Sequence, residues 1–138
     1  MCQACRCRQI AIIDQLSREH EYVLTLVGKV RNPALGRADV REIVAEIQRV
    51  LRPHTRVEED GLFPALSAYV PQRVEALTAE HRALETQLAQ LAEDAVSDDA
   101  WLRPLLTAMR VLCDHTASER EALFPVAMHA SIRLRPPR

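Results

Sequence analysis

Residues 54–64 of the chain read HTRVEEDGLFP, and residues 115–125 read HTASEREALFP. Both segments begin with His-Thr, carry a glutamate four residues after the histidine, and end with Leu-Phe-Pro. They are related by a shift of 61 positions, and the same shift places Glu19-His20 on Glu80-His81. The chain therefore contains two copies of one unit, each with a lone histidine followed by a His-x-x-x-Glu motif. Two copies with so long a period indicate a duplicated helical hairpin rather than a solenoid array.

Apolar residues recur at the spacing of one helix face in four stretches, at about residues 8–31, 38–68, 71–94 and 99–128. Short connections between four amphipathic helices predict an all-α fold, specifically an up-down-up-down antiparallel four-helix bundle built from two tandem helical hairpins. Pro53 and Pro64 fall inside the second stretch, so we expect a kink at the first and a bend near the second. Ser97 and Asp98 are the expected N-cap residues of the last helix.

The composition supports a helical domain and excludes several classes of protein. The 138 residues fit one domain, and only three of them are glycines, which argues against a turn-rich β fold. A formal net charge of −1 gives no basic surface for nucleic acid. No apolar run approaches the roughly 20 residues that a membrane-spanning helix needs, and the N-terminus lacks the pattern of a secretory signal. We therefore expect a cytoplasmic protein.

Three of the four cysteines, Cys2, Cys5 and Cys7, lie close together at the N-terminus. Their Cys-x-x-Cys-x-Cys pattern offers three thiolates, one fewer than a closed tetrahedral zinc site uses. We favour a mobile tail of reduced, reactive cysteines over a metal or redox site, and we expect Cys113 to pack as a small apolar residue. The expected organisation is a cysteine-rich tail, a bundle and a C-terminal tail, at residues 1–9, 10–130 and 131–138.

Polar residues that can bind metal lie on the faces expected to form the core. Residues four apart share one face of a helix, so His54 and Glu58 point the same way, and so does the matching pair in the second copy. A lone histidine interrupts the apolar stripe of each remaining helix. The six core-facing residues are His20, His54, Glu58, His81, His115 and Glu119. Burying unpaired carboxylates is very costly, whereas a pair of cations would compensate them, and imidazole with carboxylate suits iron, manganese or zinc.

Each of these signals is weak when it is taken alone. A lone histidine on an apolar face is usually a hydrogen-bonded core residue, and a single His-x-x-x-Glu pair often forms a surface contact. Four of the five histidines, however, lie at equivalent positions of the two copies. The repetition therefore favours a metal site. His129 has no counterpart and is expected at the surface, and the Leu-Phe-Pro motifs are expected to pack the helix ends.

The order of these motifs resembles the hemerythrin-like HHE cation-binding domain family over about residues 10–128. The resemblance implies a non-haem di-iron centre in a four-helix bundle, with two iron ions joined by an oxo or hydroxo bridge. Members of the family include reversible oxygen carriers, sensors of oxygen or iron, and proteins linked to peroxide or nitric oxide. The roles that it implies are bridging carboxylates at Glu58 and Glu119, one iron bound by His20 and His54, and the other iron bound by His81 and His115.

The sequence departs from the oxygen-carrying members at Glu85. In those members a further histidine follows the position of His81 by four residues, and here that residue is a glutamate. Glu85 corresponds to Leu24 in the first copy, so it breaks the symmetry of the two halves. We expect Glu85 to be a seventh metal ligand rather than a solvated helix residue. An anionic ligand favours ferric iron, which argues against simple reversible oxygen carriage.

Two classes of function are implied by the resemblance. The first is a redox-active di-iron protein that binds or reacts with dioxygen, peroxide or another small diatomic ligand, with catalase-like and ferroxidase-like activities as candidates. The second is a regulatory module that senses iron or oxygen and whose metal site controls its fold or its contact with a partner. Gly61 and Ala122 occupy equivalent positions near the motifs, where small residues leave room for a small ligand or let two helices pack closely.

Overall fold

The computed structural model describes the backbone of residues 3–93 and 98–129 and the side chains of residues 10–93 and 101–129. Its elements are α1 Gln3–Val30, α2 Arg37–Val57, η1 Glu58–Leu62, α3 Phe63–Leu66, α4 Pro71–Ala92, α5 Asp98–Ser118, η2 Glu119–Leu123 and α6 Phe124–His129. No strand occurs among these described residues. The two η elements are short π-helical segments that continue α2 and α5, so the chain forms four long helical rods.

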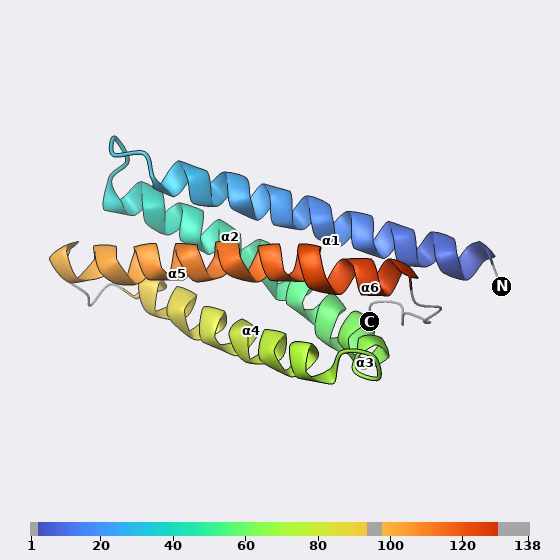
Figure 1. The fold of residues 1–138 in the computed structure, drawn as a ribbon. Helices are drawn as coiled ribbons and strands as arrows, with labels where there is room; N and C mark the ends of the chain where they lie inside the picture. The colour runs from blue at the N-terminus through green and yellow to red at the C-terminus, as the bar shows by residue number, and fades with distance from the viewer. Residues whose placement is uncertain (1–2, 94–97, 130–138) are drawn as a thin grey trace.

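Successive rods run in opposite directions along the bundle, as Figure 1 shows. α1 packs against α2, α2 against α4, and α4 against α5, and α1 closes the ring by packing against α5 and α6. The predicted all-α antiparallel bundle of two tandem hairpins is therefore confirmed. Within the described ranges, no helix combines the length and the hydropathy that crossing a bilayer requires.

The first helix begins at Gln3, rather than near residue 8 as the sequence pattern suggested. Residues 3–9 contain no glycine or proline, and Gln, Ala and Arg are good helix formers, so nothing in this segment interrupts the helix. The backbone at Cys5 and Cys7 thus belongs to α1. Cys2 lies outside the described residues. At its other end, α1 stops at Val30, just before Asn32 and Pro33.

Two clusters of buried apolar side chains fill the bundle. Members of the first cluster include Val23, Val44, Ile47, Leu84, Trp101 and Leu112. Members of the second cluster include Leu16, Leu62, Phe63, Leu77, Leu123 and Phe124. Most residues of the four predicted stripes are buried, while Leu24, Leu51 and Val74 are half-buried. Cys113 is also half-buried and packs against the first cluster, as expected of a small apolar residue.

The histidines lie at the boundary between these clusters on every rod. On α1, for example, His20 follows Leu16 of the second cluster and precedes Val23 of the first. The same arrangement on the other three rods gives the bundle a polar layer between two apolar layers. Since apolar packing above and below excludes water, polar groups in this layer must find their partners within the protein.

A π-helical turn follows each His-x-x-x-Glu motif at equivalent positions of the repeat. The N–H of Phe63 donates to the carbonyl of Glu58, and the N–H of Phe124 donates to the carbonyl of Glu119, five residues back in each case. Such turns insert one extra residue into a helix and are frequent at functional sites. α2 itself continues as α-helix through Pro53, and Pro64 falls in the first turn of α3, where a missing N–H is tolerated.

The start of α5 is fixed by an aromatic residue. The indole Nε1 of Trp101 donates to the carbonyl of Leu91 at 3.1 Å, which ties α5 to the end of α4. The guanidinium of Arg37 lies 5.2 Å from the centroid of this indole, so the start of α2 is joined to the same end of the bundle. Asp98 is the first residue of α5, and the other expected capping residue, Ser97, lies outside the described residues.

Candidate metal centre

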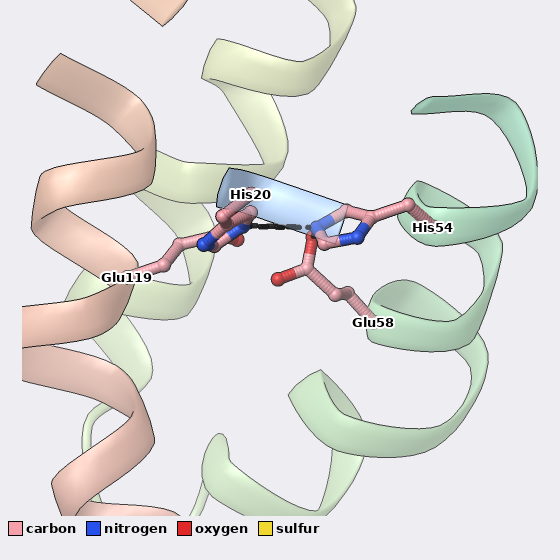
Figure 2. A group of neighbouring side chains, drawn as sticks. All are labelled: His20, His54, Glu58 and Glu119. Carbon is pink, nitrogen blue, oxygen red and sulfur yellow. Dashed lines mark hydrogen bonds and ion pairs between the residues drawn. The ribbon is translucent and has the colours of Figure 1, made fainter. Parts of the chain in front are cut away.

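Six of the seven predicted ligands converge in the polar layer of the bundle. All six are buried, and both glutamates are 0% exposed. They are His20 of α1, His54 of α2, Glu58 of η1, His81 of α4, His115 of α5 and Glu119 of η2. They form two groups of four that share Glu58 and Glu119, and the ligand atoms of each group lie within 4.8 Å of one another. The first group adds His20 and His54 (Figure 2), and the second adds His81 and His115.

Glu119 lies between imidazoles of all four rods, and its Oε1 is 4.0 Å from Nε2 of His54. Its Oε1 is 2.9 Å from Nε2 of His20. Its Oε2 is 3.3 Å from Nε2 of His115 and 3.6 Å from Nε2 of His81. One oxygen therefore faces the first group and the other faces the second, an arrangement that suits a carboxylate shared by two cations.

Glu58 occupies the corresponding position in the other half. Its Oε1 is 3.2 Å from Nε2 of His54 and 3.3 Å from Nε2 of His81, so it also faces both groups. Within the first group, Nε2 of His20 lies 3.0 Å from Nε2 of His54. The nitrogens of all four imidazoles that face the centre are thus Nε2 atoms.

The buried acceptors of this centre lack sufficient partners in the protein. Among the described residues, none of the four carboxylate oxygens of Glu58 and Glu119 makes a well-aligned hydrogen bond. Nε2 of His81 makes none either. An uncompensated buried carboxylate is strongly unfavourable, whereas a cation held between carboxylates and imidazoles would satisfy these atoms. Imidazole nitrogen and carboxylate oxygen are ligands that iron, manganese and zinc accept. The donor set therefore fits a pair of divalent or trivalent cations.

The mutual contacts change the acidities of the buried groups. Burial alone lowers the pKa of His81, but contacts with Glu119 and Glu58 outweigh it and raise that pKa to about 10. The pKa values of His54 and His115 are raised in the same way, since contacts with Glu119 again outweigh burial. Burial raises the pKa of Glu119, but contacts with Glu58 and the imidazoles outweigh it, and the pKa lies well below its usual value. Without metal, protons on His54, His81 and His115 thus offset the negative charge of Glu119.

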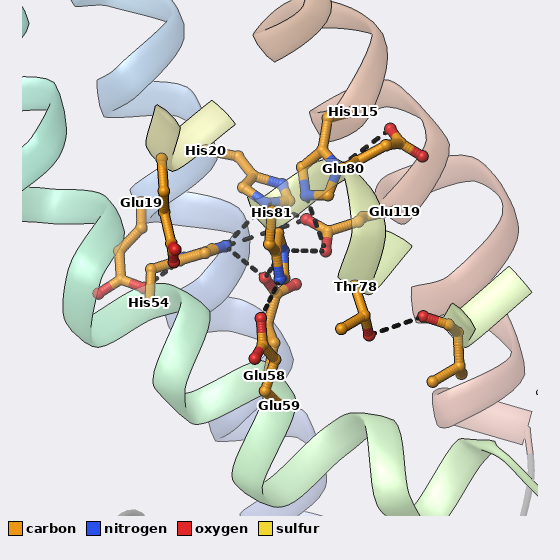
Figure 3. A network of polar contacts seen from close by, with 12 residues as sticks. Glu19, His20, His54, Glu58, Glu59, Thr78, Glu80, His81, His115 and Glu119 are labelled. Atoms are coloured by element: carbon orange, nitrogen blue, oxygen red, sulfur yellow. Dashed lines mark hydrogen bonds and ion pairs between the residues drawn. The ribbon is translucent and has the colours of Figure 1, made fainter. Parts of the chain in front are cut away.

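Three further glutamates contact the outer nitrogens of the histidines, and sequence reasoning assigned them no role. Nδ1 of His54 is 2.8 Å from Oε1 of Glu19, and Nδ1 of His115 is 3.2 Å from Oε1 of Glu80. Nδ1 of His81 is 2.6 Å from Oε2 of Glu59 (Figure 3). A carboxylate in this position orients the ring and directs Nε2 toward a metal. The repeat of Glu19-His20 as Glu80-His81 was the available signal for two of them.

The phenylalanines of the Leu-Phe-Pro motifs pack on two of the imidazoles. Phe124 stacks on His20 with ring centroids 5.4 Å apart, and Phe63 stacks on His81 at the same distance. The interplanar angles are 12° and 9°, so the rings are nearly parallel. The motifs thus pack helix ends, as predicted, and also fix the orientation of a candidate ligand.

A comparison with family models adds independent evidence, because the model of the hemerythrin HHE cation-binding domain matches residues 11–127. The chain belongs to this family. Comparisons with curated proteins and with solved structures found no match. The family assignment confirms the resemblance seen in the sequence and agrees with the cation site that the buried His/Glu groups indicate.

The hemerythrin domain has a cavity of about 320 Å³ beside the imidazoles. All four candidate metal-binding histidines line it. Its other walls include Leu51, Leu84 and Leu88, with Gln48, Arg52 and Glu85 as polar members. Gly61 is buried in η1 and does not line this cavity, whose walls come mainly from α2 and α4, with His20 of α1 and His115 and Thr116 of α5.

Glu85 is the one predicted ligand that lies outside both groups of the hemerythrin domain. Its side chain is 54% exposed, and its two oxygens accept hydrogen bonds from Nη1 of Arg82 at 2.6 and 2.7 Å. Arg82 also contacts Glu59 through Nη2. Glu85 nevertheless lines the cavity, one turn after His81 on the same helix.

Proposed function

We propose that the hemerythrin domain holds two iron ions and uses them to bind or react with dioxygen, peroxide or another small diatomic ligand. The observation that carries the proposal is the sharing of Glu58 and Glu119 between two groups, each of which has two histidines of its own. Two imidazoles with carboxylate are the ligand type of non-haem iron sites that keep positions open for oxygen chemistry. A pair of iron ions would supply the redox chemistry there.

The residues around the centre support a site for a small ligand. Glu58 and Glu119 would bridge the ions, His20 and His54 would bind one, and His81 and His115 would bind the other. The cavity of about 320 Å³ lies beside all four imidazoles, and its leucine walls favour an uncharged molecule such as dioxygen or hydrogen peroxide. Stacking of Phe63 and Phe124 would hold two imidazoles in place during ligand exchange.

Regulation by metal is the second candidate function. The observation that favours it is that each of the four rods contributes a histidine to one centre. Metal would therefore link all four rods, and its gain, loss or oxidation would change the stability of the bundle. A sensing module is expected to change its stability and its contacts without turnover, whereas an enzyme is expected to consume peroxide or to oxidise ferrous iron continuously.

Anaerobic iron loading tests the di-iron proposal. We expect two irons per chain by elemental analysis, and near-ultraviolet charge-transfer bands after oxidation that a zinc-loaded sample lacks. His81→Gln should reduce the iron content, while His129→Gln, which alters an exposed histidine on α6, should keep both irons. A ratio of one iron per chain after complete loading would contradict the proposal. Steady-state assays of peroxide consumption and ferrous oxidation then separate the two candidate functions.

A further inference from the structure

The four imidazoles of the centre differ in the groups that contact their outer nitrogens. Carboxylates of Glu19, Glu59 and Glu80 lie within 3.2 Å of Nδ1 of three histidines. Nδ1 of His20 is buried and makes no hydrogen bond with any residue in the described part of the chain. In the described part of the chain, its ring contacts Phe124 by stacking, the His54 ring at a tilted angle, and the partners of Nε2.

The repeat explains where this difference arises. Glu19 and Glu80 are equivalent under the 61-residue shift and serve the equivalent His54 and His115. Glu59, which contacts His81, has an arginine as its equivalent, Arg120. Arginine has no acceptor for an imidazole N–H, so the equivalent contact cannot form at His20.

The charge at the position that pairs with Glu59 is also opposite in the two copies. Arg82 contacts the second oxygen of Glu59 and so holds it against His81. The equivalent of Arg82 in the first half is Glu21. The acid and base are thus exchanged between two equivalent pairs of positions, each with one residue from each copy: Glu59 with Arg82, and Arg120 with Glu21.

We propose that Glu59 is a positioning residue that makes the two metal positions unequal, so that the position of His81 and His115 fills before the position of His20 and His54. This inference rests on the proposed two-metal centre, since Glu58 and Glu119 are common to both positions. Both imidazoles of the first-filled position have a carboxylate on Nδ1, whereas the other position has one such imidazole.

The physical reason is the effect of a carboxylate on a histidine ligand. A carboxylate that accepts the Nδ1–H bond fixes the tautomer that directs the Nε2 lone pair at the metal, and it raises the basicity of that nitrogen. Loss of such a partner typically lowers metal affinity by about 10- to 100-fold. His20 has no such partner, so the metal at its position is expected to bind more weakly by a similar factor. The centre would then change between one and two metals as metal availability changes.

Stepwise metal binding tests the inference. Metal-stripped protein is titrated with Co²⁺, with calorimetry for the affinities, native mass spectrometry for the number of ions, and visible absorption for the ligand field of each equivalent. We expect two steps whose affinities differ by about 10- to 100-fold. Glu59→Gln should weaken the first step by about tenfold and shift the absorption of the first Co²⁺ equivalent. Asp60→Asn removes the same charge from an exposed neighbour in η1 and should change neither step.

A second variant tests the opposite change. The double substitution Glu21→Arg with Arg120→Glu gives the pair of positions equivalent to Glu59 and Arg82 the same acid and base arrangement, and it should strengthen the second step toward the first. Two steps of equal affinity in the parent protein would overturn the inference while leaving the two-metal proposal intact. So would a Glu59→Gln effect on the second step, or an equal effect of Asp60→Asn. A maximum of one ion per chain would overturn the two-metal proposal and this inference with it.

Discussion

At the residue scale, the role of each carboxylate at the centre depends on the side chains that it already contacts in the absence of metal. Among the described residues, Glu58 and Glu119 contact imidazoles and each other without a well-aligned hydrogen bond, so their oxygens are available to cations. Glu59 is held from both sides, by His81 and by Arg82, and therefore acts on the centre through an imidazole. The difference between a ligand and a residue that orients a ligand thus depends on the groups that each carboxylate already contacts.

Glu85 gives a prediction at this scale. We expect it to bind the metal held by His81 and His115 when that metal is present, by leaving Arg82. The exchange is feasible because an exposed ion pair contributes only about 0–1 kcal/mol. Glu85→Leu should then lower the protein's affinity for that metal by roughly tenfold, measured by competition with a chelator. Glu75→Leu removes the same charge from an exposed position nearer the start of α4, outside the cavity, and serves as the control. Unchanged iron content, spectrum and affinity in Glu85→Leu would remove Glu85 from the site.

At the scale of the element, the π-helical turns join the metal centre to the second apolar cluster. Each turn begins with a shared glutamate and ends just before the phenylalanine that stacks on an imidazole. An α-helical turn has 3.6 residues, so the extra residue of a π turn rotates the next part of the helix by about 100°. This rotation lets Glu58 face the centre and lets Phe63 and Leu66 be buried below it.

Deletion of Asp60 tests the role of the first turn. Without that residue η1 should become α-helical, and Phe63 and Leu66 should rotate out of the core. We expect a loss of about 3–5 kcal/mol in the free energy of unfolding, comparable to truncating a buried phenylalanine. Asp60→Ala keeps the extra residue and should change stability by less than about 1 kcal/mol. Urea unfolding of both variants measures the difference, and equal stabilities would show that the turn has no packing role.

At the scale of the whole molecule, a layer of ionisable groups crosses the bundle between two apolar clusters. Every rod contributes to this layer, so its protonation and its metal content act on the whole fold at once. Without metal, neighbouring carboxylates stabilise the protonated imidazoles. These imidazoles offset the negative charge of Glu119, whose pKa is lowered well below its usual value. With metal, the same nitrogens must lose their protons to become ligands.

The stability of the metal-free protein should therefore fall as pH rises above neutrality. The pKa of His81 is raised from 6.5 to about 10, and the pKa values of His54 and His115 are also raised. A raised pKa contributes stability that is complete below 6.5 and is lost as pH rises toward about 10. Melting in the presence of a chelator should show a declining Tm across this window, and His81→Gln should flatten the decline. A constant or rising Tm would contradict the assignment of imidazolium-carboxylate pairs.

The sequence by itself determined the four helices, their stripes and six convergent residues, because helical spacing is local and the 61-residue repeat makes it visible. Spacing places His54 and Glu58 on one face whatever surrounds them. The tertiary structure alone decided the contacts between rods. Glu59 reaches His81, 22 positions away on another helix, only because α2 and α4 are neighbours with a particular rotation. Arg82 and Glu85 pair locally at i,i+3 on α4, and the rotation of α4 in the bundle places Glu85 at the cavity edge with its side chain 54% exposed, whereas the resemblance to the family had suggested a metal ligand there. Neighbours and rotation are set by packing of the whole bundle, which no single helix records.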